Sequence, residues 1–249
     1  MNDRVPEPES PIDLVVRDLG RMAYAEAYEL QRSLQRVVID ARPRLPAPGY
    51  LLLVEHDPPV ITISRRASAR QHLVATPEQL RAAGVEVAET DRGGDITYHG
   101  PGQLVVYPVL DLNALGLRLH SYMRFLEQVV IDVLAEFDVR GERDPQATGV
   151  WVRGKAQEWP SLGFEAPPDA RPAKIAALGV RISRWVSMHG LALNVMPDLS
   201  HFNLIVPCGL AGRAVTSMKR ELGEACPAMD QVKAVMVTRF EAAVRGAIP

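Results

Sequence analysis

The strongest candidate for a catalytic residue in this chain is a cysteine. Cys208 lies between Pro207 and Gly209, directly after the apolar run at residues 204–206. A cysteine at the end of a strand suits a nucleophile, because nearby backbone N–H groups are available to an oxyanion. The competing interpretation is a small core hydrophobe, the commonest role of buried cysteine. Cys226 lacks this context, and we expect it to be inert.

A nucleophilic cysteine needs a partner, because a thiol at its reference pKa is only a few per cent thiolate at neutral pH. His99 or His189 would make a cysteine–histidine pair. Lys174 would instead place a cation beside the thiolate, and it heads an otherwise apolar run at residues 175–182. A surface lysine whose stem lies along apolar neighbours fits that position equally well. Spacing alone leaves the choice between histidine and lysine open.

A glycine-rich segment at residues 92–103 is the next unusual feature, and it reads RGGDITYHGPGQ. Glycine lets the backbone bend sharply and lets a ligand approach the main chain. An ordinary hairpin needs one or two turn residues. The segment predicts a bend that presents Tyr98 and His99, although a long connection without chemistry fits these residues as well.

Small residues also interrupt the apolar segment 185–195, where Gly190 and Ala192 follow His189. They leave room on one strand face for another backbone or for an apolar ligand tail. The sequence contains no G-x-x-x-x-G-K-[ST] phosphate loop, and residues 92–103 do not fit G-x-G-x-x-G. Both observations count against a nucleotide or dinucleotide site.

Composition excludes several classes of protein. The 249 residues carry a net charge of −2, so no global basic field suggests nucleic acid. Two cysteines are too few for a disulfide framework, and no cysteine–histidine spacing predicts a metal site. Residues 1–11 lack the features of a signal peptide and predict a disordered tail, and no apolar run is long enough to span a bilayer. We therefore expect a cytoplasmic protein that binds neither membrane nor nucleic acid.

Alternating and helical patterns predict the elements that must position these residues. The prediction is a single α+β domain over residues 12–249, with a mixed sheet flanked by helices. A polar, proline-containing connector at residues 153–173 predicts a mobile loop. Strands are expected at residues 12–17, 50–55, 60–63, 85–88, 104–110, 149–152, 175–182 and 185–195, and helices at residues 21–40, 77–83, 121–137 and 230–244.

The motifs at residues 92–103, 174–182, 189–194 and 207–209 occur in an order that resembles the octanoyltransferases of lipoate biosynthesis. The resemblance covers roughly residues 14–240. It implies the fold of the biotin and lipoate protein ligase catalytic domain, an acyl-thioester on Cys208 and a catalytic role for Lys174. The implied substrate-binding residues, with His189 in support, are Arg92, Gly93, Gly94, Asp95, Ile96, Thr97, Tyr98, His99, Ala177, Leu178, Gly179, Gly190, Leu191 and Ala192.

The resemblance also implies partners. The donor would be octanoyl-acyl carrier protein, and the acceptors would be lipoyl domains of 2-oxoacid dehydrogenase subunits and the glycine cleavage H protein. Neither cofactor nor metal is implied, and a monomer is expected. Arginine clusters near residues 65–70 and 213–220 would suit acidic partners. The alternatives are an ATP-dependent lipoate or biotin protein ligase and a non-catalytic acyl- or carrier-binding module.

The chain departs from the family pattern in two places. Ser64 stands where the family usually has a glycine, so the turn fits only if the φ angle of Ser64 is negative or its strain is tolerated. The connector at residues 153–173 is also longer than the resemblance implies.

Overall fold

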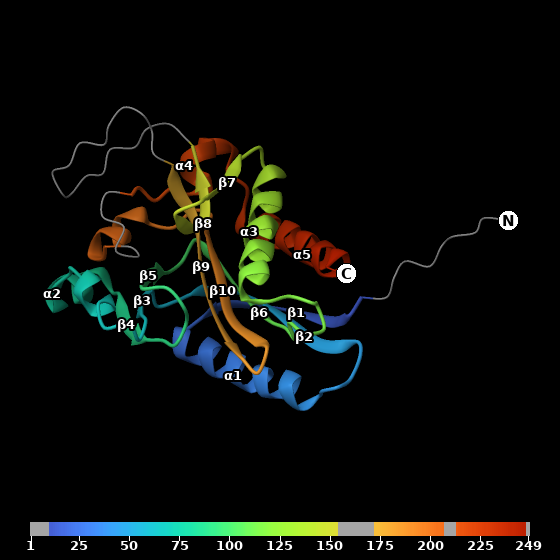
Figure 1. Cartoon of the computed structure of the whole chain (residues 1–249). Helices are drawn as coiled ribbons and strands as arrows, with labels where there is room; N and C mark the ends of the chain where they lie inside the picture. The colour runs from blue at the N-terminus through green and yellow to red at the C-terminus, as the bar shows by residue number, and fades with distance from the viewer. Residues whose placement is uncertain (1–9, 154–171, 207–212, 248–249) are drawn as a thin grey trace.

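A computed structural model describes residues 10–153, 172–206 and 213–247. The main sheet is mixed, because β1 and β2 pair in parallel while the other neighbouring strands pair antiparallel. The predicted α+β class with a mixed sheet is confirmed (Figure 1). Its seven strands lie in the order β1 (Ile12–Met22), β2 (Ala47–His56), β6 (Gln103–Val109), β10 (Val186–Asn194), β9 (Ala173–Ser183), β8 (Ala147–Val152) and β7 (Gly141–Asp144).

A second, three-stranded sheet has the order β4 (Glu86–Glu89), β3 (Val60–Ile63) and β5 (Ile96–His99). Strand β5 corrects the prediction that Tyr98 and His99 lie at a bend, because both residues are in a strand paired with β3. The glycines at each end of β5 make the turns, and the four residues between them alternate across the sheet. This alternation sends neighbouring side chains of the glycine-rich segment to opposite faces.

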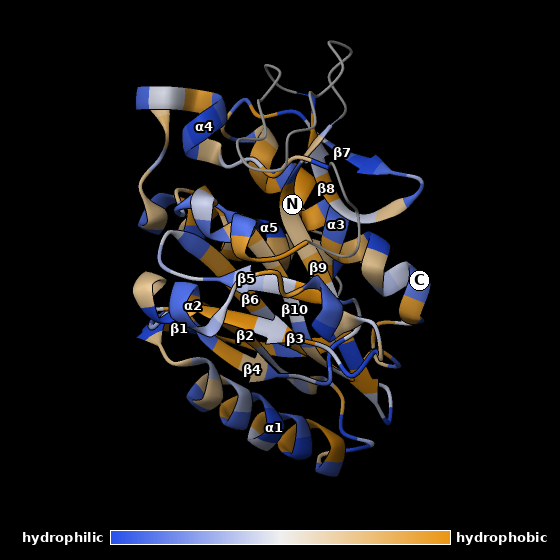
Figure 2. Ribbon diagram, turned by 90° about the vertical axis from the view of Figure 1, so that its left-hand side faces the viewer, coloured by the Kyte–Doolittle hydropathy of each residue, from blue (hydrophilic) through white to orange (hydrophobic). Residues whose placement is uncertain are grey.

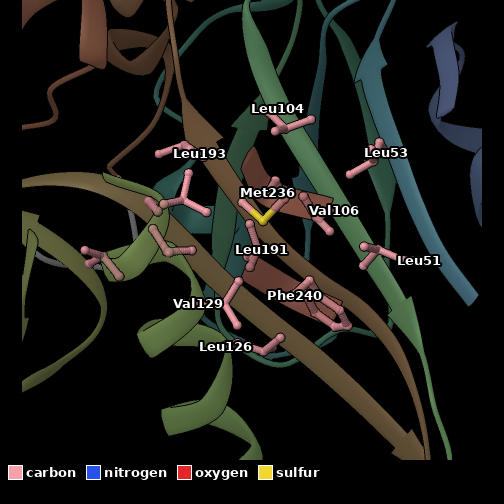
Figure 3. Close-up of a cluster of buried hydrophobic side chains, with 14 of the residues drawn as sticks. Leu51, Leu53, Leu104, Val106, Leu126, Val129, Leu191, Leu193, Met236 and Phe240 are labelled. Carbon is pink, nitrogen blue, oxygen red and sulfur yellow. The ribbon is translucent and has the colours of Figure 1, made fainter. Parts of the chain in front are cut away.

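Helices cover both faces of the main sheet. Alternation along β2 shows this directly, since Leu51 and Leu53 pack with α3 (Leu119–Ala135) and α5 (Met229–Gly246) (Figure 3). Leu52 and Val54 belong to a separate cluster with α1 (Tyr24–Asp40). Figure 2 shows hydrophobic and hydrophilic residues intermixed along α1, as expected of a helix with one buried stripe.

The short helix α2 (Pro77–Ala83) follows from local sequence alone. The Thr76 hydroxyl oxygen caps its start by accepting from the Gln79 N–H, and the side-chain oxygen Oε1 of Gln79 accepts from the Thr76 N–H. Gly84 ends the helix in the left-handed conformation that favours glycine. Among the described residues, the remaining short helices are α4 (Met218–Leu222) and the 3₁₀ turns Ala69–His72, Leu199–Leu204 and Gly223–Ala225.

Most of the predicted elements are present, with ends shifted by a few residues. Strand β7 was not predicted, because its residues Gly-Glu-Arg-Asp lack any apolar alternation, as an edge strand permits. Most of the connector predicted to be mobile, residues 154–171, lies outside the described residues. Within the part of the chain that the structure describes, no helix is long and apolar enough to cross a membrane.

Candidate active site

Lys174 lies near the start of β9, on the edge of an open pocket. Its ammonium nitrogen Nζ donates to the carbonyl oxygen of Thr148 at 3.0 Å and lies 4.7 Å from the centre of the Trp151 ring. Gly149 leaves room for this side chain: a Cβ there would lie 3.4 Å from Nζ and 2.8 Å from the carbonyl oxygen of Ala176. The φ of Gly149 is +131°, which also favours glycine. The ammonium therefore lies against β8, beside Thr148, Gly149 and Trp151.

Cys208 lies outside the described residues, within the gap at 207–212. The residues on both sides of that gap are described. The backbone N–H of Val206 donates to the carbonyl of His72 at 2.7 Å. Arg213 stacks on Trp151, with its guanidinium carbon 4.1 Å from the ring centre, and forms an ion pair with Asp144. Arg213 and Lys174 thus contact the same indole ring.

Most of the predicted substrate-binding residues line two adjoining hollows. The open pocket is lined by Lys174, Gly93 and Asp95 among others. A narrow cavity opens from it, with about 470 Å³ of empty space including solvent at its mouth. Gly94, Ala177, Leu178 and Gly179 line both hollows. The predicted residues that line only the narrow cavity are Arg92, Thr97, His99, His189, Gly190, Leu191 and Ala192.

Ile96 and Tyr98 lie elsewhere. Both are buried in a cluster with Phe202 and Ile205, on the other side of β5 from Thr97 and His99. The hydroxyl of Tyr98 is 2.8 Å from His201 Nδ1. The period of two along a strand makes this division necessary, so Ile96 and Tyr98, which the resemblance implied as substrate-binding residues, line neither hollow.

The glycine-rich loop at residues 92–95 packs against β9 of the main sheet at Gly179 and Val180. The N–H of Gly93 donates to the carbonyl of Val180 at 2.9 Å, and a Cβ at Gly179 would lie 2.7 Å from the carbonyl oxygen of Gly93. Gly94 has a φ of +97°. The hydroxyl of Ser64 donates to the Gly94 carbonyl at 3.1 Å, and Ser64 is not among the described non-glycine residues with positive φ. Serine therefore replaces the family's glycine without backbone strain, and it holds the loop.

A side chain at Gly94 should impair the site. Gly94→Ala adds strain of about 1–2 kcal/mol at a positive φ, in a loop that lines both hollows. We expect kcat/KM to fall about tenfold if that strain displaces the loop. Gly84→Ala is the matched control, because Gly84 also has a positive φ (+64°) but ends α2 with no atom within 4 Å of a new Cβ. Equal activity of the two variants would show that the Gly94 loop has no functional geometry.

The ionisable rings around the narrow cavity are uncharged at neutral pH. Burial lowers the pKa of His99 well below its ordinary value and also lowers that of His189. The Nε2 atom of His189 is 2.9 Å from Asp91 Oδ1, and this hydrogen bond holds the pKa of Asp91 well below its usual range. His189 therefore donates as a neutral imidazole to a carboxylate. Burial also raises the pKa of Tyr24 to about 12.

A buried chain of amides links the cavity to Lys174. His99 Nδ1 lies 2.7 Å from Gln103 Oε1, and Gln103 Nε2 donates to Asn194 Oδ1 at 2.9 Å. Asn194 Nδ2 donates to the Thr216 carbonyl, and the Thr216 N–H donates to the Lys174 carbonyl, each at 2.9 Å. Three motifs separated in sequence thus hold one another in place, and His99 carries its proton on Nδ1.

Comparison with known proteins decides the family. A model of the lipoyl protein ligase A/B catalytic domain matches residues 24–241. An octanoyltransferase from Chloroflexus aggregans is 48% identical over 215 residues, which are 86% of this chain and 87% of that protein. The chain belongs to the octanoyltransferase family. An octanoyltransferase from Gloeobacter violaceus is 46% identical and covers 89% of this chain and 86% of its own length.

Octanoyltransferase membership makes the chain an acyltransferase of lipoate biosynthesis. Its fold is shared with a bipartite lipoate protein ligase from Thermoplasma acidophilum. That match has a TM-score of 0.64 and 14% identity over 92% of this chain and 82% of the ligase chain, so it shows the fold alone.

The predicted set omitted several residues of this candidate site. Gly149 and Trp151 make the setting of Lys174, Asp91 binds His189, and Tyr24, Val105 and Tyr107 line the narrow cavity. Gly149 carried a usable signal, a glycine at the start of a predicted strand. The others look like ordinary core or surface residues in the sequence.

Proposed function

We propose that this acyltransferase moves an octanoyl group from octanoyl-acyl carrier protein to a lysine of a lipoyl domain, through a thioester on Cys208. The observation that carries the proposal is the position of Lys174: its ammonium lies where an open pocket meets a narrow cavity whose lining is mostly uncharged. Arg92 also lines this cavity, and its guanidinium donates hydrogen bonds to the carbonyl and the hydroxyl of Thr62. The small, apolar and neutral aromatic side chains of the rest of the lining suit an alkyl chain, because burial of apolar surface is favourable.

Chain connectivity supports the pairing of Lys174 with Cys208. Arg213 follows Cys208 by five residues, a reach of at most about 18 Å for an extended chain. The backbone beyond Arg213 runs beside β9, where the Lys174 N–H donates to the Ala214 carbonyl at 2.9 Å. A cation near a thiol lowers its pKa and raises the thiolate fraction.

The reaction then balances without nucleotide. The Cys208 thiolate attacks the donor's thioester carbonyl, the new carbon–sulfur bond forms, and the carrier's sulfur leaves as a thiol after taking a proton from the Lys174 ammonium. The amine of the acceptor lysine attacks the acyl-enzyme next, the now neutral Lys174 amine accepts its proton, and Cys208 leaves as thiolate. Exchange of one thioester for another is nearly neutral in free energy, and thioester to amide is downhill.

The proposal predicts transfer without ATP. The purified enzyme is incubated with an apo lipoyl domain and either octanoyl-acyl carrier protein or octanoate plus ATP, and the acceptor is followed by intact mass. We expect octanoylation from the thioester alone, with a labile acyl adduct on the enzyme before the acceptor is added. Octanoylation only from octanoate and ATP would establish a ligase instead.

A further inference from the structure

Small residues in register make the floor of the narrow cavity. On adjacent strands Gly179 pairs with Gly190 and Ala177 pairs with Ala192. On the next strand Val105 is the partner of Ala192. The floor therefore crosses three neighbouring strands, β9, β10 and β6, in that order (Figure 1).

Burial shows which end of this floor is open. Ala177 and Gly179 on β9 are partly exposed and also line the open pocket. Ala192 on β10 is 3% exposed and Val105 on β6 is 1% exposed. Lys174 lies at the open end, because it lines the open pocket together with Ala177 and Gly179.

Aromatic side chains held by hydrogen bonds close the far end. The Tyr107 hydroxyl is 2.7 Å from His56 Nε2, and His56 Nδ1 is 3.1 Å from the Met22 carbonyl. The carbonyl only accepts, so His56 donates from Nδ1 and accepts the Tyr107 hydroxyl at Nε2. The Tyr24 hydroxyl donates to Thr90 Oγ1 at 2.8 Å. Rings tied in this way do not swing aside as an unbranched aliphatic side chain would.

The distance along the floor fits one chain length. Neighbouring strands lie about 4.8 Å apart, so β9 to β6 spans roughly 9.6 Å. That span is close to the length of an extended eight-carbon acyl chain.

We propose that Tyr107 is the stop that sets acyl chain length: the acyl group crosses β9 and β10 over Ala177 and Ala192, and its methyl end meets the Tyr107 ring beside Val105. This inference rests on the acyl transfer proposed above. A longer chain would have to displace a hydrogen-bonded ring, whereas a shorter chain would leave part of the cavity unfilled.

Competition between donors of different length tests the stop. The rate of acyl-enzyme formation is measured by mass spectrometry with octanoyl, decanoyl and dodecanoyl thioesters of acyl carrier protein. Tyr107→Ala should raise the dodecanoyl-to-octanoyl ratio about tenfold or more, the scale on which hydrophobic pockets discriminate methylenes. Tyr107→Phe keeps the ring but loses the bond to His56, and its ratio should lie between those of wild type and Tyr107→Ala.

A second variant is expected to shift the preference toward shorter acyl chains. Ala192→Leu fills the floor before the stop, and it should lower the octanoyl rate relative to butanoyl thioester about tenfold. Val106→Ala is the matched control, because Val106 adjoins Tyr107 on β6 but packs in the cluster on the other sheet face; its ratios should equal those of wild type.

The outcomes separate this inference from the proposed function. A raised dodecanoyl-to-octanoyl ratio in Tyr107→Ala, with Val106→Ala unchanged, supports the stop, and an altered ratio in Ala192→Leu supports the path of the chain over the floor. A wild-type ratio in Tyr107→Ala while octanoyl transfer proceeds would overturn the stop alone. Failure of the wild-type enzyme to accept any acyl thioester would overturn the proposed function, and the stop with it.

Discussion

Cys208→Ala is expected to abolish the acyl-enzyme and to reduce octanoyl transfer by about 10³-fold or more, the scale seen when a covalent nucleophile is removed. The reason is that transfer from carrier thiol to acceptor amine would lose its intermediate. Incubation with octanoyl-acyl carrier protein followed by peptide mass mapping measures both the adduct and its position.

Cys226→Ala is the matched control for Cys208. Cys226 is partly buried beside the Val195 carbonyl, with its Sγ 3.9 Å from that oxygen, and burial raises the pKa of its thiol. A raised pKa leaves less thiolate at neutral pH, so Cys226→Ala should keep wild-type turnover. An octanoyl label on Cys226, or normal turnover by Cys208→Ala, would overturn the mechanism.

Lys174→Arg is expected to lose overall turnover by about 10²–10⁴-fold, the usual contribution of general acid–base catalysis. Arginine keeps the positive charge, but its guanidinium does not deprotonate in proteins and cannot accept a proton from the attacking amine. Some acyl-enzyme should still form, because a cation would remain near the thiol. Lys174→Ala should impair both half-reactions, and single-turnover mass spectrometry of each half-reaction separates the two variants.

Two controls distinguish chemistry from crowding at Lys174. The Lys174 side chain packs closely against the backbone of Gly149, so the bulkier guanidinium of Lys174→Arg can lower activity by displacing β8. Added small primary amines should restore transfer to Lys174→Ala if a base is what is missing. Lys219→Arg, in an exposed pair with Glu224, controls for the exchange itself. The assignment would be wrong if Lys174→Arg turned over normally while His99→Ala or His189→Ala abolished acylation.

The sequence predicted the helices and strands that local capping residues or local apolar patterns specify. The cap at Thr76, the stop at Gly84 and the apolar stripe at residues 121–137 each predict a helix that the structure contains. The alternating or apolar runs that became β2, β3, β6, β9 and β10 were likewise predicted, because burial of one or both strand faces imposes its pattern on the residues. Strand β7 has no such pattern and was missed.

The motifs of the candidate site were also evident in the sequence, but the sequence did not reveal which of their residues line the hollows and which pack elsewhere. Thr97 and His99 line the narrow cavity, while Ile96 and Tyr98 pack in a separate cluster, because β5 is a strand and not a bend. The glycines around residues 96–99 make this segment look like a loop in the sequence. It forms a strand because it pairs with β3, and local propensity does not predict that pairing.

What the sequence by itself determined is the kind of residue available to the site: a lysine heading an apolar strand, glycines at close approaches, and small residues on two strands. The tertiary structure decided which of them meet. Strand register places Gly179 against Gly190 and Ala177 against Ala192. Packing sets the Lys174 ammonium over Trp151 and places Tyr107 in the lining of the narrow cavity. These contacts join residues far apart in the chain, so their energies come from pairing and burial, which no local sequence pattern records.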